Sequence, residues 1–155
     1  MLRGLRLPAS AALVLLFILL CTATGSPGGE PPGDWLIAGQ VFDPPEVFRK
    51  RSVVILHGFG GSPYDVKPLM DALEGSGFRL LAPVIPGETE GSTVEERGES
   101  TFEEKMAWLE GVIAAERERF GRNPYLVGFS MGGTLATLAA AQGMADRLAL
   151  VSPYF

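Results

Sequence analysis

One feature restricts the fold of this chain more than any other: an apolar strand that turns directly into a helix. The apolar run Tyr125–Val127 is followed by Gly128-Phe129-Ser130-Met131-Gly132-Gly133, and a small-residue segment over 134–142 comes next. A strand that becomes a helix within one residue leaves that residue, Ser130, strained and its hydroxyl exposed. Side chains two positions before and after Ser130 would collide, so the turn requires glycine at Gly128 and Gly132. The segment therefore predicts a strand, a sharp turn and a helix.

Apolar runs and helical patterns alternate along the chain from Arg51. Further apolar runs at 52–56, 78–82 and 148–152 predict buried strands, whereas the apolar spacing at 62–73 and 100–120 predicts helices. Strands that are apolar throughout and alternate with helices form a parallel sheet with helices on its faces. We therefore expect an α/β fold with a mostly parallel sheet and helices on both faces.

Capping residues predict where two of these helices begin. Ser62 can cap the first helix, and Pro68 within it delays the regular turns to about Asp65. Two capping boxes fit the start of the long helix: Ser100 with Glu103, or Thr101 with Glu104. Between the two helices, the acidic stretch Glu88–Glu99 is predicted to be a solvated loop.

A second glycine-rich segment, His57-Gly58-Phe59-Gly60-Gly61, directly follows the strand at 52–56. Glycines here let the backbone approach a ligand closely, and backbone N–H groups aimed at a developing negative charge form an oxyanion hole. A dinucleotide-binding fingerprint is excluded because Pro63 stands at the position that needs a third glycine. A phosphate-binding loop is excluded because no Gly-Lys-Ser/Thr sequence follows. The segment is therefore interpreted as an oxyanion loop.

Together, the turn at Ser130 and the loop at 57–61 resemble the α/β-hydrolase superfamily, in particular small bacterial carboxylesterases and monoacylglycerol lipases. The resemblance covers about Arg51–Phe155. It implies a serine hydrolase that acts on carboxylic esters or lipids through an acyl-enzyme on Ser130. The backbone N–H groups of Phe59 and Met131 would hold the oxyanion, and Gly58, Gly128 and Gly132 are the loop and turn glycines. No cofactor motif and no metal-binding cluster is visible in the sequence.

The resemblance also leaves residues unassigned. His57 is the only histidine; in the resembling proteins the histidine of this loop is structural, so hydrogen bonds to nearby backbone are expected of it rather than general-base catalysis. The family order is serine, acid, histidine, and the last two would follow a lid region that begins near Pro153. We therefore expect a hydrolase fold that is incomplete at its C-terminus, and no residue is assigned as the acid or base. A catalytically incomplete half-domain, or another chemistry of this fold such as a thioesterase or peptidase, stays open as an alternative.

One local departure from the family stands after the strand at 78–82. The family often has Pro-Gly-His-Gly there, whereas this chain has Pro86-Gly87-Glu88-Thr89. The change is expected to affect how that loop packs rather than the chemistry of Ser130.

The N-terminal 25 residues are predicted to be an export signal. Arg3 and Arg6 precede an unbroken apolar run over 11–21, and small residues suitable for cleavage follow. A retained membrane anchor stays open as an alternative. So does lipidation at Cys21, although Leu20 stands where a lipoprotein signal has a small residue. The Pro- and Gly-rich start of 26–50 predicts a linker, with an early strand over Trp35–Phe42. Residues 51–155 form the predicted hydrolase domain.

The overall charge narrows the class of partner. The formal net charge is −5, and nucleic-acid binding needs a basic face. A nucleic-acid partner is therefore not expected, and the small ester or lipid substrate is what the resemblance implies.

Overall fold

A computed structural model describes residues 39–42, 51–89 and 91–154 of the chain. The predicted export signal over 1–25, including Cys21, lies outside the described residues, as does most of the linker over 26–50. The early strand expected at Trp35–Phe42 is described only at its end, where Gly39–Phe42 forms strand β1. Among the described residues, no helix has both the length and the apolar character needed to cross a bilayer.

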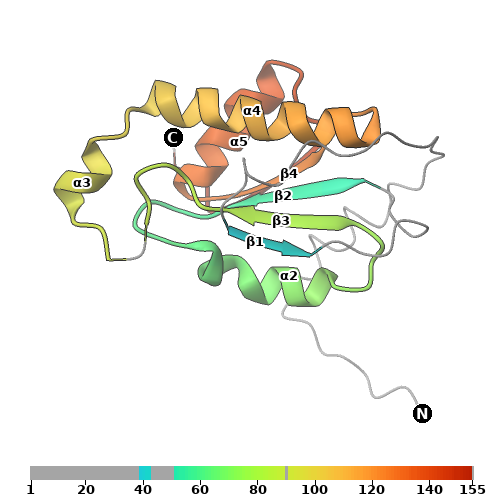
Figure 1. The fold of residues 1–155 in the computed structure, drawn as a ribbon, viewed down its shortest axis with the longest axis horizontal. Coiled ribbons are helices and arrows are strands. Elements are labelled where there is room, and N and C mark those ends of the chain that lie inside the picture. Colours follow the sequence, from blue (N-terminus) through green and yellow to red (C-terminus); the bar gives the residue numbers. More distant parts are fainter. Residues whose placement is uncertain (1–38, 43–50, 90, 155) are drawn as a thin grey trace, which may run out of the picture.

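Five strands form one sheet in the order β1-β3-β2-β4-β5 (Figure 1). Strand β1 pairs antiparallel with β3, and the other neighbouring strands pair in parallel. The strand bounds after β1 are β2 (Ser52–Leu56), β3 (Arg79–Pro83), β4 (Tyr125–Phe129) and β5 (Arg147–Val151). The predicted mostly parallel sheet is therefore confirmed. Because β2 lies next to β4, their carboxyl ends bring the loop at 57–61 to the side of Ser130.

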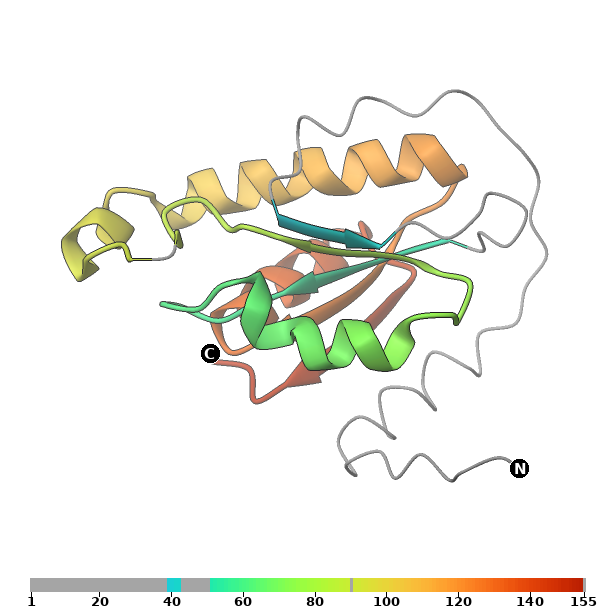
Figure 2. The same ribbon diagram turned by 60° about the horizontal axis from the view of Figure 1, so that its bottom comes forward.

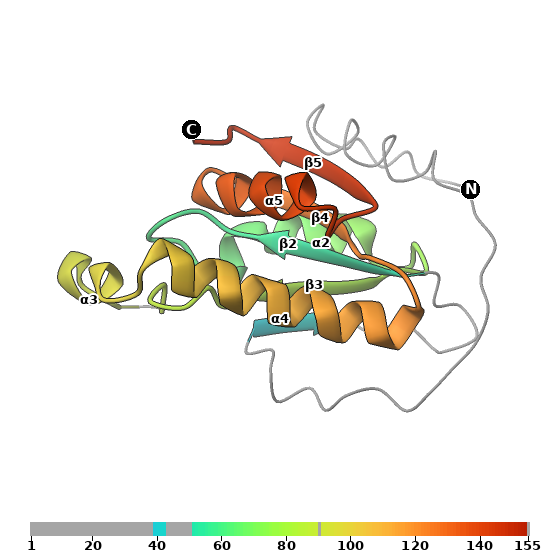
Figure 3. The ribbon, with the colours of Figure 1, turned by 90° about the horizontal axis from the view of Figure 1, so that it is seen from above.

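Helices cover both faces of the sheet (Figures 2 and 3). The short 3₁₀ helix η3 (Pro63–Val66) and helix α2 (Lys67–Leu73) lie on one face, whereas α4 (Phe102–Phe120) and α5 (Met131–Ala141) lie on the other. Successive side chains of a strand point to opposite faces. In β2, Val53 and Ile55 accordingly pack in the core beneath α2, and Val54 and Leu56 pack in the core beneath α4 and α5. The apolar run at 52–56 is therefore continuous because both of its faces are buried.

The regular part of the first helix begins at Lys67, two residues later than predicted. Ser62 caps the preceding 3₁₀ turn in a capping box with Asp65, as its side chain accepts from the Tyr64 N–H and Asp65 accepts from the Ser62 N–H. Pro68 has no N–H to donate, so it is accommodated in the first turn of the helix. The proline thus shifts the α-helix further along the chain than the periodicity indicates.

The acidic stretch Glu88–Glu99 is not simply a solvated loop, and that prediction is wrong in two respects. A short helix, α3 (Val94–Gly98), begins with a capping box between Thr93 and Glu96. Glu88 is completely buried rather than solvated. Of the two capping boxes that fit the start of α4, the structure uses Thr101 with Glu104.

Ion pairs hold the amino ends of the strands, opposite the end that carries Ser130. The Arg79 side chain at the start of β3 lies 3.2 Å from Glu116 of α4, and both are almost fully buried. Burial raises the pKa of Glu116, and the nearby Arg79 guanidinium opposes that shift. Arg51 pairs with Asp146 at 2.7 Å across the starts of β2 and β5. These ion pairs therefore stabilise one end of the sheet, and the candidate site lies in the loops at the opposite end.

Candidate active site

Ser130 occupies a strained turn between β4 and α5. Its φ and ψ are 49° and −120°, a region that residues other than glycine rarely adopt. The side chain is exposed, as the strand-to-helix pattern predicts. Backbone hydrogen bonds on both sides of Ser130 stabilise this conformation. The Ser130 N–H donates to the Val151 carbonyl, and the Ser130 carbonyl accepts from the N–H groups of Gly133 and Thr134.

The glycines around Ser130 are required by close backbone contacts. A Cβ on Gly128 would lie 2.5 Å from the Gly132 carbonyl oxygen, which is the predicted crowding between these two positions. A Cβ on Gly132 would lie 2.4 Å from the carbonyl oxygen of His57 and 2.5 Å from that of Leu56. Sequence reasoning missed this second contact, in which the first turn of α5 packs directly on the backbone of β2. Gly132 therefore sets the distance between Ser130 and the neighbouring loop.

The loop at 57–61 and Ser130 lie side by side, as the resemblance implies. A Cβ on Gly58 would be 3.2 Å from the Ser130 Cβ and 3.7 Å from its Oγ. A side chain at position 58 would therefore press on the Ser130 Cβ, while it would only touch the hydroxyl oxygen. Phe59 next to Gly58 is 55% exposed, and Met131 is half-buried against the core beneath α4 and α5.

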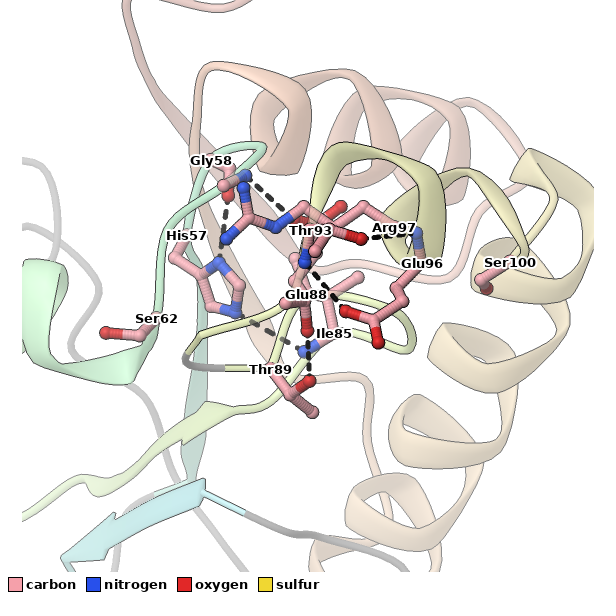
Figure 4. Close-up of polar contacts among 12 residues, drawn as sticks. His57, Gly58, Ser62, Ile85, Glu88, Thr89, Thr93, Glu96, Arg97 and Ser100 are labelled. Atoms are coloured by element: carbon pink, nitrogen blue, oxygen red, sulfur yellow. Dashed lines mark hydrogen bonds and ion pairs between the residues drawn. The ribbon is translucent and has the colours of Figure 1, made fainter.

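His57 is completely buried beneath this loop (Figure 4). The Ile85 N–H donates to its Nε2 at 3.3 Å, so the ring proton is on Nδ1, which donates to the Gly58 carbonyl at 3.0 Å. Burial lowers the pKa of His57 below its usual value, against the opposing effects of the Gly58 bond and of the Glu88 and Asp65 carboxylates. The predicted role of His57 in binding nearby backbone is confirmed. Because both ring nitrogens are used, His57 is not available as a general base.

The bonds to the Gly58 carbonyl orient the next amide group. That oxygen accepts from His57 Nδ1 and from the Gly61 N–H at 3.1 Å. In a planar trans peptide the N–H points opposite to the C=O, and the described residues contain no cis peptide bond. The Phe59 N–H therefore points away from His57 and Gly61. Met131 begins α5, where N–H groups have no partner within the helix and the positive end of the helix dipole lies.

Glu88 is the residue near this site that sequence reasoning missed. Its Oε2 accepts the Gly60 N–H at 2.7 Å, so a buried carboxylate from the segment after β3 contacts the loop at 57–61. The only signal in the sequence was the replacement of the family's histidine in Pro86-Gly87-Glu88-Thr89. Among the described residues, no group of three or more His, Cys, Asp or Glu side chains could hold a metal ion.

The buried imidazole makes one pH effect predictable. The folded protein holds His57 with a pKa below 6.5, whereas the unfolded chain binds a proton near pH 6.5. The stabilisation from the neutral ring is thus complete above pH 6.5 and is lost as the pH falls below it, by up to about 1.4 kcal/mol per pH unit. Urea unfolding at pH 7.5 and 5.5 should show this loss, and His57→Gln should reduce it. Equal pH dependence in both proteins would contradict the assignment.

Comparison with known proteins agrees with this geometry. A family profile described as "alpha/beta hydrolase fold" matches residues 51–153. A thermostable monoacylglycerol lipase from Bacillus sp. (strain H-257) is 31% identical over 99 residues, which are 64% of this chain and 38% of that protein. The crystal structure of a monoacylglycerol lipase from Paleococcus ferrophilus matches with a TM-score of 0.57 and 30% identity. That match covers 74% of this chain and 42% of the lipase.

The chain thus spans about two fifths of the length of these relatives. Within that span, the parallel order β3-β2-β4-β5, the helices on both faces and the strained turn after β4 accompany the family match. The resemblance predicted from the sequence is confirmed, and the chain belongs to the α/β-hydrolase fold family.

Proposed function

We propose that this protein hydrolyses carboxylic esters, with Ser130 as the nucleophile. The observation that carries the proposal is the approach of Gly58 to Ser130, since a Cβ at position 58 would lie 3.2 Å from the serine Cβ. An exposed hydroxyl on a strained turn thereby lies beside a loop whose Phe59 N–H points away from His57 and Gly61. That combination suits attack on a carbonyl carbon and stabilisation of its oxygen.

In the proposed reaction, Ser130 Oγ attacks the ester carbonyl carbon and its proton passes to a general base. The carbonyl oxygen becomes anionic and accepts hydrogen bonds from the N–H groups of Phe59 and Met131. The alcohol then leaves with a proton, and water releases the acid from the acyl-serine. A serine hydroxyl needs a base for this attack, and His57 is committed to the backbone. We propose that the base and its acid follow these residues in a longer protein, since the relatives are more than twice as long.

The names of the relatives suggest which esters to test first as substrates. Both are named monoacylglycerol lipases, so monoacylglycerols are the first esters to test. The exposed Phe59 ring beside the oxyanion loop is compatible with an apolar acyl group, because an exposed aromatic surface gains from covering by hydrocarbon. A matched pair of glycerol esters with short and long acyl chains would measure that preference.

Covalent labelling tests the proposed nucleophile directly. The full-length gene product is expected to react with a fluorophosphonate probe, and peptide mass spectrometry should locate the adduct on Ser130. A heat-unfolded sample is the control, because labelling by an activated serine depends on the folded site. A folded protein without an adduct on Ser130, or with the adduct on another serine, would contradict the proposal.

A further inference from the structure

Glu88 lies in the loop that follows β3, with its side chain turned inward. None of its surface is exposed, although it belongs to an acidic stretch of the sequence. A buried carboxylate is costly unless hydrogen bonds and opposite charges offset the loss of hydration. The groups around Glu88 therefore indicate what its burial achieves.

Three segments contribute partners to this carboxylate, and Figure 4 shows Arg97 beside Glu88. The Gly60 N–H of the oxyanion loop donates to Oε2 at 2.7 Å. Arg97 of α3 approaches with its Nε 3.7 Å from Oε2. Lys105 of α4 approaches with its Nζ 3.9 Å from Oε1. The bond to Gly60 is the shortest of the three, and it is the one that reaches the candidate site.

The bond to Gly60 completes the restraint of Phe59. The peptide before Phe59 is held through the Gly58 carbonyl, which accepts from His57 and Gly61. The peptide after Phe59 contains the Gly60 N–H, which Glu88 holds. The φ and ψ angles of residue 59 are therefore restrained from both sides. Gly60 itself has a φ of 70°, and a glycine free of such a bond would move readily between conformations.

The two cations balance the charge of Glu88 and tie it to the helical side of the molecule. Lys105 is almost buried and also donates to the Ser100 carbonyl at 3.0 Å. The Arg97 guanidinium lies 6.0 Å from the centre of the Phe59 ring. A Cβ on Gly87 would lie 3.0 Å from the Ser100 Cβ and 3.3 Å from Lys105 Nζ. The loop that carries Glu88 is thus wedged between the oxyanion loop and the start of α4.

We propose that Glu88 is a positioning residue that aims the Phe59 N–H at the reacting oxygen. It acts by holding the Gly60 N–H while Arg97 and Lys105 neutralise its charge. Glu88 does not touch the substrate in this role, and the inference rests on the proposed hydrolysis by Ser130. A misaligned oxyanion donor weakens binding of the transition state more than binding of the substrate. Loss of Glu88 should therefore lower kcat and leave KM nearly unchanged.

Two substitutions of similar size separate this role from simple packing. Glu88→Leu removes the acceptor, whereas Glu88→Gln keeps an oxygen that can accept the Gly60 N–H. With a monoacylglycerol substrate, Glu88→Leu is expected to lower kcat about 10- to 100-fold and to leave KM within about threefold. Glu88→Gln should retain kcat within about tenfold of wild type and well above the leucine variant. Glu95→Gln, at an exposed position on α3, is the control and should match wild type.

The binding of an oxyanion mimic gives a second measure. A trifluoromethyl ketone forms a negatively charged hemiketal with the catalytic serine, so its affinity should fall with kcat across the variants. Wild-type kcat in Glu88→Leu, or equal loss of kcat in the leucine and glutamine variants, would overturn the positioning role.

An activity-independent measurement keeps the proposal testable if a variant folds poorly. In the wild-type protein, the Gly60 amide is expected to exchange slowly with solvent deuterium, although Gly60 is exposed. Exchange as fast as that of a free amide would overturn the role of Glu88. Slow Gly60 exchange together with no Ser130 labelling would contradict the hydrolase proposal instead. Normal labelling with unchanged kcat in Glu88→Leu would contradict only the role of Glu88.

Discussion

Replacing Ser130 by alanine is expected to lower kcat/KM for an ester substrate by about 10⁴-fold or more. The alanine variant keeps the backbone amides of Phe59 and Met131 but has no oxygen that can form the acyl-enzyme. Any remaining rate would come from a water molecule acting in the same site, which is a far poorer arrangement. Steady-state hydrolysis of a monoacylglycerol by the full-length gene product measures the effect.

Ser152 provides a matched control for that experiment. It is exposed and also has a left-handed backbone, with a φ of 45°. It follows β5, the strand next to the one that carries Ser130, and the Val151 carbonyl before it accepts the Ser130 N–H. Ser152→Ala leaves that backbone bond in place, so it should retain kcat/KM within about threefold, as is usual when an exposed side chain is shortened. Equal losses in both variants would indicate that strained serines in general are needed for folding, and would remove the special role of Ser130.

The largest loss of stability is expected for Gly132→Ala. The added methyl group would lie 2.4 Å and 2.5 Å from the carbonyl oxygens of His57 and Leu56. Both oxygens belong to backbone at the end of a buried central strand, which cannot shift without opening the core. The free energy of unfolding should fall by more than about 4 kcal/mol, beyond the usual range for a single substitution. Chemical unfolding, or loss of soluble protein on expression, would show it.

The same substitution at Gly111 should have the opposite sign. Gly111 lies in the middle of α4 on its exposed side, and a Cβ there would meet nothing within 4 Å. Alanine in an exposed helix interior is favoured over glycine by about 0.5–1 kcal/mol. A Gly132→Ala protein as stable as Gly111→Ala would mean that α5 does not pack on the β2 backbone as described.

Local stereochemistry explains which parts of the site could be predicted from the sequence. The turn at Ser130 could be predicted from the glycines on either side of it, because steric crowding between residues close in sequence does not depend on the rest of the fold. The apolar run at 52–56 likewise predicted a strand buried on both faces. The backbone role of His57 was expected from the resemblance, and the bonds to Gly58 and Ile85 confirm it.

Contacts between distant segments explain what the sequence did not reveal. Charged loop residues are usually solvated, so the sequence predicts a solvated Glu88. Its burial depends on Arg97 and Lys105, which come from two different helices. The sequence correctly predicts that position 132 needs glycine. However, only the strand order shows that the backbone of β2, rather than Gly128, is its main neighbour. Helix α3 was missed even though the Thr93–Glu96 capping box is legible in the sequence. A capping signal without an apolar stripe was too weak to outweigh the polar composition.

The strand order has a consequence for biosynthesis. Strand β2 occupies the interior of the sheet, yet both of its neighbours, β3 and β4, come later in the chain. At about 5–20 residues per second, a ribosome needs roughly 4–15 s after making β2 to finish β4. During that interval the Val-Val-Ile-Leu segment of the nascent polypeptide has at least one unpaired edge, which is the kind of surface that chaperones shield and that aggregates recruit.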